Sequence, residues 1–188
     1  MRHTRRQSQP LSLNKTSRNE QKGCFKSPFF FCPKIFYYGK KVILFMYSLQ
    51  AEASFDAAHF LAGHADKCRN LHGHRWLVRA ELCAPDLQTA GTERSMLLDF
   101  ANFKQTLKRL AADLDHKFIY ERGSLQPSTI AALQAEGFAL AEMPFRPTAE
   151  ELARWFYQAL TEHGLKPTRV WLYETPENCA SYFEEGGV

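Results

Sequence analysis

The sequence predicts one α+β domain that occupies most of its 188 residues. Residues 48–60 and 71–83 each alternate between apolar and polar side chains, a period of two that is typical of half-buried strands. Two later stretches carry apolar residues at helical spacing, and two further strand-like stretches follow them. Strands and helices that are grouped along the chain in this way favour an α+β fold.

The elements between the first strands and the last follow from local signals. Asp99 is placed to cap a helix that runs to about residue 114. Residues 127–136 predict a short helix that ends at Gly137, and residues 138–143 predict a short strand. Thr148 and Glu151 have the spacing of a capping box, so a second amphipathic helix begins there.

Two short strands, residues 169–174 and 180–184, close the domain and are joined by a turn over the letters TPEN. Glu174 shares a strand face with Val170 and Leu172, so we expect its carboxylate to point inward. An inward carboxylate without a partner is costly, which makes Glu174 a candidate for ligand binding.

The charge is divided unevenly along the chain. Residues 1–45 hold ten Lys and Arg and one acid, whereas residues 46–188 hold fourteen Lys and Arg and nineteen acids. The net charge of +4 therefore comes from the N-terminal segment and is no argument for nucleic-acid binding by the domain. We expect residues 1–45 to be a disordered leader, or to precede a true start at Met46, and residues 46–188 to form the domain. No apolar run reaches the roughly 18 residues of a membrane span.

Five cysteines at irregular spacing, three of them after residue 45, do not resemble a disulfide framework. This pattern favours a reducing compartment, so we expect a cytoplasmic protein.

The stretch KCRNLHGHRW carries the strongest functional signal. On a strand, His72 and His74 present their imidazoles on the same face, and His59 ends the matching face of the preceding strand. If the two strands pair, the three imidazoles converge and suit a tetrahedral Zn²⁺ with one open position. Cys68 lies between Lys67 and Arg69, and its spacing fits equally a fourth metal ligand or a reactive thiolate beside the metal.

Six motifs give the chain a specific likeness to a known family. They are FDAAH (55–59), CRNLHGH (68–74), LDF (98–100), LDH (114–116), PTAE (147–150) and YET (173–175). In this order, and over about residues 47–182, they resemble the 6-pyruvoyltetrahydropterin synthase superfamily, most closely its bacterial 6-carboxytetrahydropterin synthase branch. The resemblance implies the tunnelling fold, an antiparallel sheet with helices packed on one face that oligomerises into a β-barrel.

The same resemblance assigns roles to residues. It implies that the three histidines bind zinc and that Cys68 is the general base rather than a ligand. Asp115 and His116 would be the acid–base partners of Cys68. Glu174 would anchor the pterin ring and belong to the catalytic set, with Thr148 and Glu150 near the same pocket. Without the resemblance, Thr148 is equally a helix cap, and Asp115–His116 an ordinary surface pair.

The implied reaction is zinc-dependent conversion of 7,8-dihydroneopterin triphosphate to 6-carboxy-5,6,7,8-tetrahydropterin, with release of acetaldehyde and triphosphate, in queuosine (7-deazaguanine) biosynthesis. The alternatives are the pyruvoyl-forming reaction, in which triphosphate is eliminated, and a non-catalytic structural zinc protein. The family implies a homohexamer, a dimer of trimers with sites at subunit interfaces, and no nucleic-acid or membrane partner. Residues of about 123–143 depart from the family pattern as an insertion.

Overall fold

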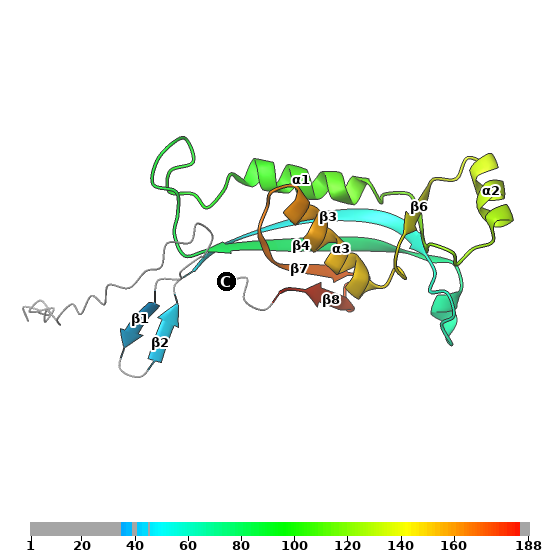
Figure 1. Cartoon of the computed structure of the whole chain (residues 1–188), viewed down its shortest axis with the longest axis horizontal. Coiled ribbons are helices and arrows are strands. Elements are labelled where there is room, and N and C mark those ends of the chain that lie inside the picture. The colour runs from blue at the N-terminus through cyan, green and yellow to red at the C-terminus, as the bar shows by residue number, and fades with distance from the viewer. Residues whose placement is uncertain (1–34, 39–40, 45, 185–188) are drawn as a thin grey trace, which may run out of the picture. The chain divides into compact units, whose positions relative to one another are not determined.

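The computed structural model describes residues 35–38, 41–44 and 46–184, and it confirms the α+β class (Figure 1). Its elements are β1 Ile35–Tyr38, β2 Lys41–Leu44, β3 Tyr47–His59, the 3₁₀ turn η1 Lys67–Arg69, β4 His72–Ala84, α1 Phe100–Ala112, β5 Phe118–Glu121, α2 Pro127–Ala135, β6 Leu140–Met143, α3 Ala149–Glu162, β7 Pro167–Tyr173 and β8 Cys179–Tyr182. The ends of the predicted elements differ from these by a few residues, as expected where helices and strands fray.

Most of the expected leader lies outside the described residues. Within it, β1 and β2 pair with each other as an antiparallel hairpin. The division of the chain at residue 45 stays a prediction.

The main sheet has six strands in the order β6-β5-β3-β4-β7-β8. β3, β4, β7 and β8 pair antiparallel, as the resemblance implied, but β5 and β6 join parallel, so the sheet is mixed. β5 was not predicted. Parallel neighbours need a crossover connection, and α2 supplies it between β5 and β6.

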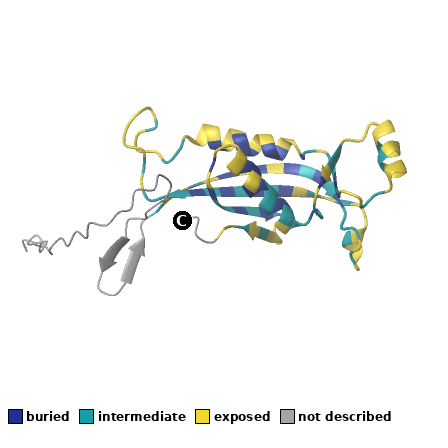
Figure 2. Cartoon of the chain, in the orientation of Figure 1, coloured by how far each residue is buried: buried dark blue, intermediate teal, exposed yellow. Residues whose placement is uncertain are grey.

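The core lies between one face of this sheet and the helices α1 and α3. The inward residues of β3 and β4 alternate with less buried ones along both strands (Figure 2). Phe55 and Trp76 are fully buried among the inward residues. Phe103 of α1 and Phe156 of α3 are equally buried in the same apolar cluster. The predicted packing of helices on one face of the sheet is therefore confirmed.

Local hydrogen bonds fix the ends of the helices as the sequence predicts. The Asp99 carboxylate accepts from the backbone N–H of Ala101 at 2.8 Å and begins α1. The Thr148 hydroxyl accepts from the backbone N–H of Glu151 at 3.3 Å and begins α3. Both caps satisfy N–H groups that have no partner within the helix.

α2 ends in a Schellman motif at Gly137, which has φ +83°. Its N–H donates to the Gln134 carbonyl at 3.0 Å, and the Phe138 N–H donates to the Leu133 carbonyl at 3.0 Å. Phe138 therefore belongs to the helix end rather than to β6, which begins only at Leu140. None of the residues of α2 is buried. Within the described part of the chain, no helix is long and apolar enough to cross a membrane.

Candidate active site

Pairing of β3 with β4 brings the three predicted histidines together. His59 lies directly opposite His72, and Ala57 lies opposite His74, so the three imidazoles share one face at the end of the strand pair. Their ring centroids are 4.5 Å (His59–His72), 5.2 Å (His59–His74) and 5.0 Å (His72–His74) apart. The period-two spacing of HGH and the strand register together produce this convergence.

Backbone carbonyls orient two of the rings. His59 Nδ1 lies 2.8 Å from the carbonyl oxygen of Pro147, and His72 Nδ1 lies 2.7 Å from that of Asn70. Because a carbonyl only accepts, each Nδ1 donates its proton, and the Nε2 lone pair of each ring is left for another partner. Such second contacts are typical of metal-ligating histidines.

Burial favours the neutral form of His59 and of His74. His59 is fully buried, which lowers its pKa to about 4, and burial also lowers the pKa of His74. The Nε2 atoms of both residues are shielded from solvent and lack a hydrogen-bond partner among the described residues. Neutral imidazoles with free lone pairs are the form that binds a divalent cation.

Glu174 completes this cluster. Its Oε1 lies 3.4 Å from His59 Nε2 and 3.4 Å from His74 Nε2. The donor atoms of the three histidines and Glu174 all lie within 4.8 Å of one another. Three nitrogens and one carboxylate oxygen are a donor set that suits Zn²⁺. We name His59, His72, His74 and Glu174 the His/Glu cluster.

Sequence reasoning gave Glu174 a role in substrate binding and missed its place in this donor set. The register between β4 and β7 is the signal that places Glu174 in the donor set. Tyr173 pairs with Leu77, so the next residue, Glu174, comes beside Trp76, two positions from His74 on the same face. That register depends on a pairing between distant segments, which no local pattern reveals.

Cys68 lies outside the His/Glu cluster. It belongs to η1, is half-buried and is a free thiol. Cys68 is absent from the group of donor atoms that lie together, whereas Glu174 belongs to it, and the role of Cys68 stays a prediction.

Asp115 and His116 form a tightly held pair beside β3. Asp115 accepts from the backbone N–H of Asp56 at 2.8 Å through Oδ1, and His116 Nδ1 lies 2.8 Å from Asp115 Oδ2. The bond from Asp56 and the bond to His116 hold the pKa of Asp115 below its usual range. Since the carboxylate accepts, His116 carries its proton on Nδ1 and exposes Nε2.

The backbone of His116 is strained. Its φ is +54°, in the left-handed region that non-glycine residues rarely occupy, and its N–H donates to the Asp56 carbonyl at 2.7 Å. Strain of this kind gathers at functional sites, where the surrounding structure maintains it. This favours a functional role for the pair over an ordinary surface pair.

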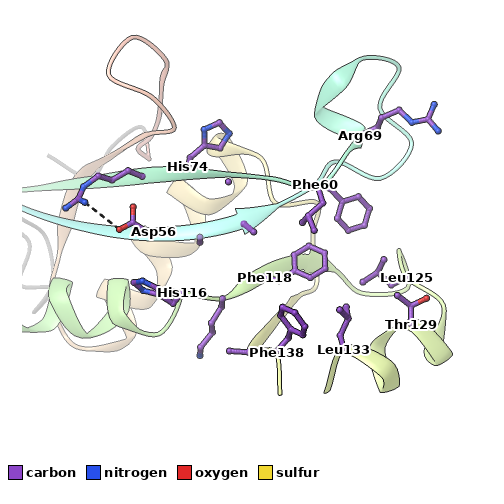
Figure 3. A pocket seen from close by; sticks show the side chains of 17 residues that line it. Asp56, Phe60, Arg69, His74, His116, Phe118, Leu125, Thr129, Leu133 and Phe138 are labelled. Carbon is purple, nitrogen blue, oxygen red and sulfur yellow. Dashed lines mark ion pairs between the residues drawn. The ribbon is translucent and has the colours of Figure 1, made fainter. Parts of the chain in front are cut away.

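The acid–base pair and the His/Glu cluster lie on opposite sides of the strands. In Figure 3 the His74 ring projects from one side of β3 and β4, and His116 lies on the other. His116 lines a pocket with Asp56, Ala58 and Gly73, which alternate with the inward residues of the two strands, and His74 also borders this pocket. The structure brings the predicted metal ligands together but does not bring His116 to them within one chain.

The two remaining predicted residues lie close to the cluster along the chain. Thr148 follows Pro147, whose carbonyl holds His59, and its hydroxyl serves as the cap of α3. Glu150 is exposed in the first turn of that helix. Contact of either residue with a pterin stays a prediction.

Comparison with known proteins places the chain. Residues 48–185 match the family model of 6-pyruvoyl tetrahydropterin synthase. The chain belongs to this family. It is 38% identical over 142 residues to the 6-carboxy-5,6,7,8-tetrahydropterin synthase of Haemophilus influenzae, and the alignment covers 74% of this chain and 100% of that protein. It is 32% identical over 140 residues to the enzyme of the same name from a Synechocystis strain, covering 73% of this chain and 94% of that one.

Solved structures share the fold of this 6-pyruvoyl tetrahydropterin synthase family member. An uncharacterized protein from Wolinella succinogenes aligns with a TM-score of 0.64 at 23% identity, over 75% of this chain and 99% of that chain. The 6-pyruvoyl tetrahydropterin synthase of Plasmodium vivax aligns with a TM-score of 0.54 at 19% identity, over 74% and 98%. At these identities the likeness establishes the tunnelling fold alone.

Proposed function

We propose that this protein converts 7,8-dihydroneopterin triphosphate to 6-carboxy-5,6,7,8-tetrahydropterin, releasing acetaldehyde and triphosphate, as a zinc-dependent step of queuosine biosynthesis. The curated relatives named above support this product. The observation that carries the proposal is the His/Glu cluster, in which two buried imidazole nitrogens lack any other partner.

Different residues of the chain take different roles in this reaction. A Zn²⁺ ion held by the His/Glu cluster would supply a Lewis acid that polarises a reactant oxygen. Cys68, as a thiolate, removes a proton from the reactant side chain, and triphosphate leaves by elimination. One water then adds to the side chain and supplies the second carboxylate oxygen, and cleavage of the bond between the first two side-chain carbons releases the outer two as acetaldehyde. Asp115 fixes the Nδ1 proton of His116, so that Nε2 is the atom that takes and returns protons. Glu150 and Thr148 hold the pterin ring.

Within this proposal Glu174 either binds the pterin or serves as a metal ligand. As a pterin anchor, its carboxylate would accept from ring N–H groups and leave the metal an open position. As a permanent fourth ligand, it would close the site, as in a structural zinc protein. Replacement by Gln distinguishes them: an anchor role predicts that Glu174→Gln retains one zinc per chain and loses turnover. Loss of zinc in this variant would favour the closed site.

The position of His116 favours a site shared between copies. His116 lies on the other side of β3 and β4 from the His74 ring, although both residues line one pocket, and this placement favours service to a reactant at the cluster of another subunit. We therefore propose that the active protein is an oligomer, a homohexamer made of two trimers, with each site assembled from the His/Glu cluster of one copy and the Asp115–His116 pair of another.

The decisive experiment compares two alanine variants. Cys68→Ala should abolish turnover of 7,8-dihydroneopterin triphosphate while zinc stays stoichiometric, because Cys68 lies outside the donor set. His72→Ala should lose zinc and activity together. Zinc is measured by elemental analysis and product by mass spectrometry. An active Cys68→Ala variant, or loss of its zinc, would overturn the assigned roles.

The second candidate is the pyruvoyl-forming reaction on the same substrate, which the description of the matching family favours. The same assay decides between them, because only the carboxy-forming reaction releases acetaldehyde. If neither product forms while zinc is bound, the non-catalytic alternative gains support.

A further inference from the structure

A shielded cation without a partner lies close to the His/Glu cluster along the chain. Arg146 belongs to the segment that joins β6 to α3 (Figure 1). Its side chain is half-buried, and its Nε and Nη2 atoms are shielded from solvent with no hydrogen-bond partner among the described residues. A shielded guanidinium nitrogen without an acceptor is costly, so these two atoms imply an acceptor that comes from elsewhere.

The acidic residues that lie near Arg146 in the sequence do not supply this acceptor. Glu142 accepts from Arg122 Nε at 2.7 Å, and Glu151 pairs with Arg154. In the part of the chain that the structure describes, Arg146 takes part in no ion pair. The acceptor for Nε and Nη2 is therefore a group from outside these residues.

The chain holds the backbone of Arg146 in a fixed place relative to His59. The Thr148 N–H donates to the Arg146 carbonyl at 2.7 Å, which closes a tight turn around Pro147. The Pro147 carbonyl in turn lies 2.8 Å from His59 Nδ1. On the other nitrogen of the same ring, Nε2, Glu174 Oε1 lies 3.4 Å away. One imidazole therefore contacts both the turn that carries Arg146 and the carboxylate of Glu174.

The two unpartnered nitrogens of Arg146 are the pair that recognises two acceptors at once. The N–H groups of Nε and Nη2 point the same way along one edge of the guanidinium, the fork that binds carboxylates, phosphates and the O6 and N7 atoms of guanine. A pterin ring presents the same pair of acceptors, because its O4 and N5 lie side by side as O6 and N7 do in guanine. Its neighbouring edge, N3–H and the 2-amino group, donates and therefore suits a carboxylate.

We propose that Arg146 binds the pterin ring through O4 and N5, while a carboxylate of the site accepts from N3–H and the 2-amino group. The choice of a pterin rests on the proposed function, whereas the need for an acceptor at Nε and Nη2 does not. Because a guanidinium stays protonated, Arg146 only donates. The turn at Pro147 holds the backbone, so the side chain alone turns to present its fork to the ring.

Arg146 also stabilises charge that develops in the reaction. When Cys68 takes a proton from the first side-chain carbon, the electron pair of that C–H bond forms a double bond to C6, and the C6–N5 double bond breaks toward N5. Negative charge then gathers on N5, where the fork donates. N5 takes up a proton from water and the Cys68 thiol returns one to water, so the step moves a proton from carbon to nitrogen and needs no oxidant.

Binding of two rings that do not react tests the contact by calorimetry. The zinc-loaded protein should bind pterin at least about tenfold more tightly than 5-deazapterin, in which a C–H replaces N5 and cannot accept. Arg146→Met, which keeps a long side chain but has neither donor, should reduce this ratio of affinities to below about twofold. Arg109→Met, at an exposed position of α1, should keep the wild-type ratio. An unchanged ratio in Arg146→Met would overturn the proposal.

The stability of the ligand-free protein separates this role from a structural one. Arg146→Met removes a shielded charge that has no partner, so the zinc-loaded variant should unfold at a higher urea concentration than wild type, with its zinc content unchanged. Unfolding at a lower urea concentration would show that the guanidinium already has a partner in the assembled protein, such as an acidic residue of a second copy. That result would overturn the proposal.

Turnover and inorganic triphosphate complete the test. Arg146→Met should lower kcat/KM for 7,8-dihydroneopterin triphosphate by about 10²-fold or more, with part of the loss in kcat, since N5 is charged only in the transition state. Weaker binding of inorganic triphosphate at an unchanged ratio for the two rings would assign the fork to phosphate and overturn the ring contact. The binding ratios do not require turnover. A ratio that depends on Arg146, in a wild-type protein that converts no substrate, would therefore refute the proposed function and leave the ring contact standing.

Discussion

Acidification of the metal-free protein should reveal the buried state of His59. A histidine in the unfolded chain has a pKa near 6.5, whereas burial lowers the pKa of His59 to about 4 in the folded protein. Between these values the unfolded chain binds a proton that the folded chain does not. The free energy of unfolding therefore falls as the pH falls through this window.

The size of the effect follows from the two pKa values. Between pH 7 and pH 5, this one group should reduce the free energy of unfolding by about 2 kcal/mol. His74, whose pKa is also lowered, adds to the loss with the same sign. Most of the stability is present above pH 6.5 and is lost progressively toward pH 4.

Urea denaturation of chelator-treated protein at several pH values measures this directly. The His59→Gln variant should be less stable but should lose about 2 kcal/mol less than wild type between pH 7 and pH 5. The control is His64→Gln, a half-buried site in the loop between β3 and β4 that lies outside the His/Glu cluster, and this variant should follow the wild-type pH dependence. If His59→Gln shows the same pH dependence as wild type, His59 is not held neutral by burial, and the assignment of its free lone pair to a metal fails.

Two further predictions concern single substitutions. His116→Gly should be more stable than His116→Ala by about 1 kcal/mol in urea denaturation, because only glycine relieves the positive φ, while both variants lose turnover by about 10²-fold or more. Greater stability of the alanine variant would argue against strain at this position. Thr148→Ala should reduce the free energy of unfolding by about 1 kcal/mol through loss of the α3 cap, and Thr148→Ser should keep it. If Thr148→Ser loses turnover at full stability, the hydroxyl position matters to the substrate as well as to the helix.

The sequence by itself determined the features that depend on neighbours within a few residues. Alternation along β3 and β4 puts His72 and His74 on one face, because the side chains of a strand have a period of two. The caps at Asp99 and Thr148 and the stop at Gly137 are equally local, since each satisfies backbone groups two to five residues away. Convergence of His59 on this pair required only one added assumption, that two strands joined by a short loop are neighbours.

Only the tertiary structure decided which distant segments meet. Glu174 joins the cluster because β7 pairs with β4 in one register, and a shift of one residue would turn its side chain to the other face. The parallel pairing of β5 with β3 and with β6 depends on which strands become neighbours in the sheet, and no pattern within either short strand shows this. The sequence also does not show on which face of the sheet Asp115 and His116 lie, because that face is fixed by hydrogen bonds to Asp56, 59 residues before Asp115 in the chain. Side-chain period is a property of adjacent residues, whereas strand register and facing are set by contacts between residues far apart in the chain.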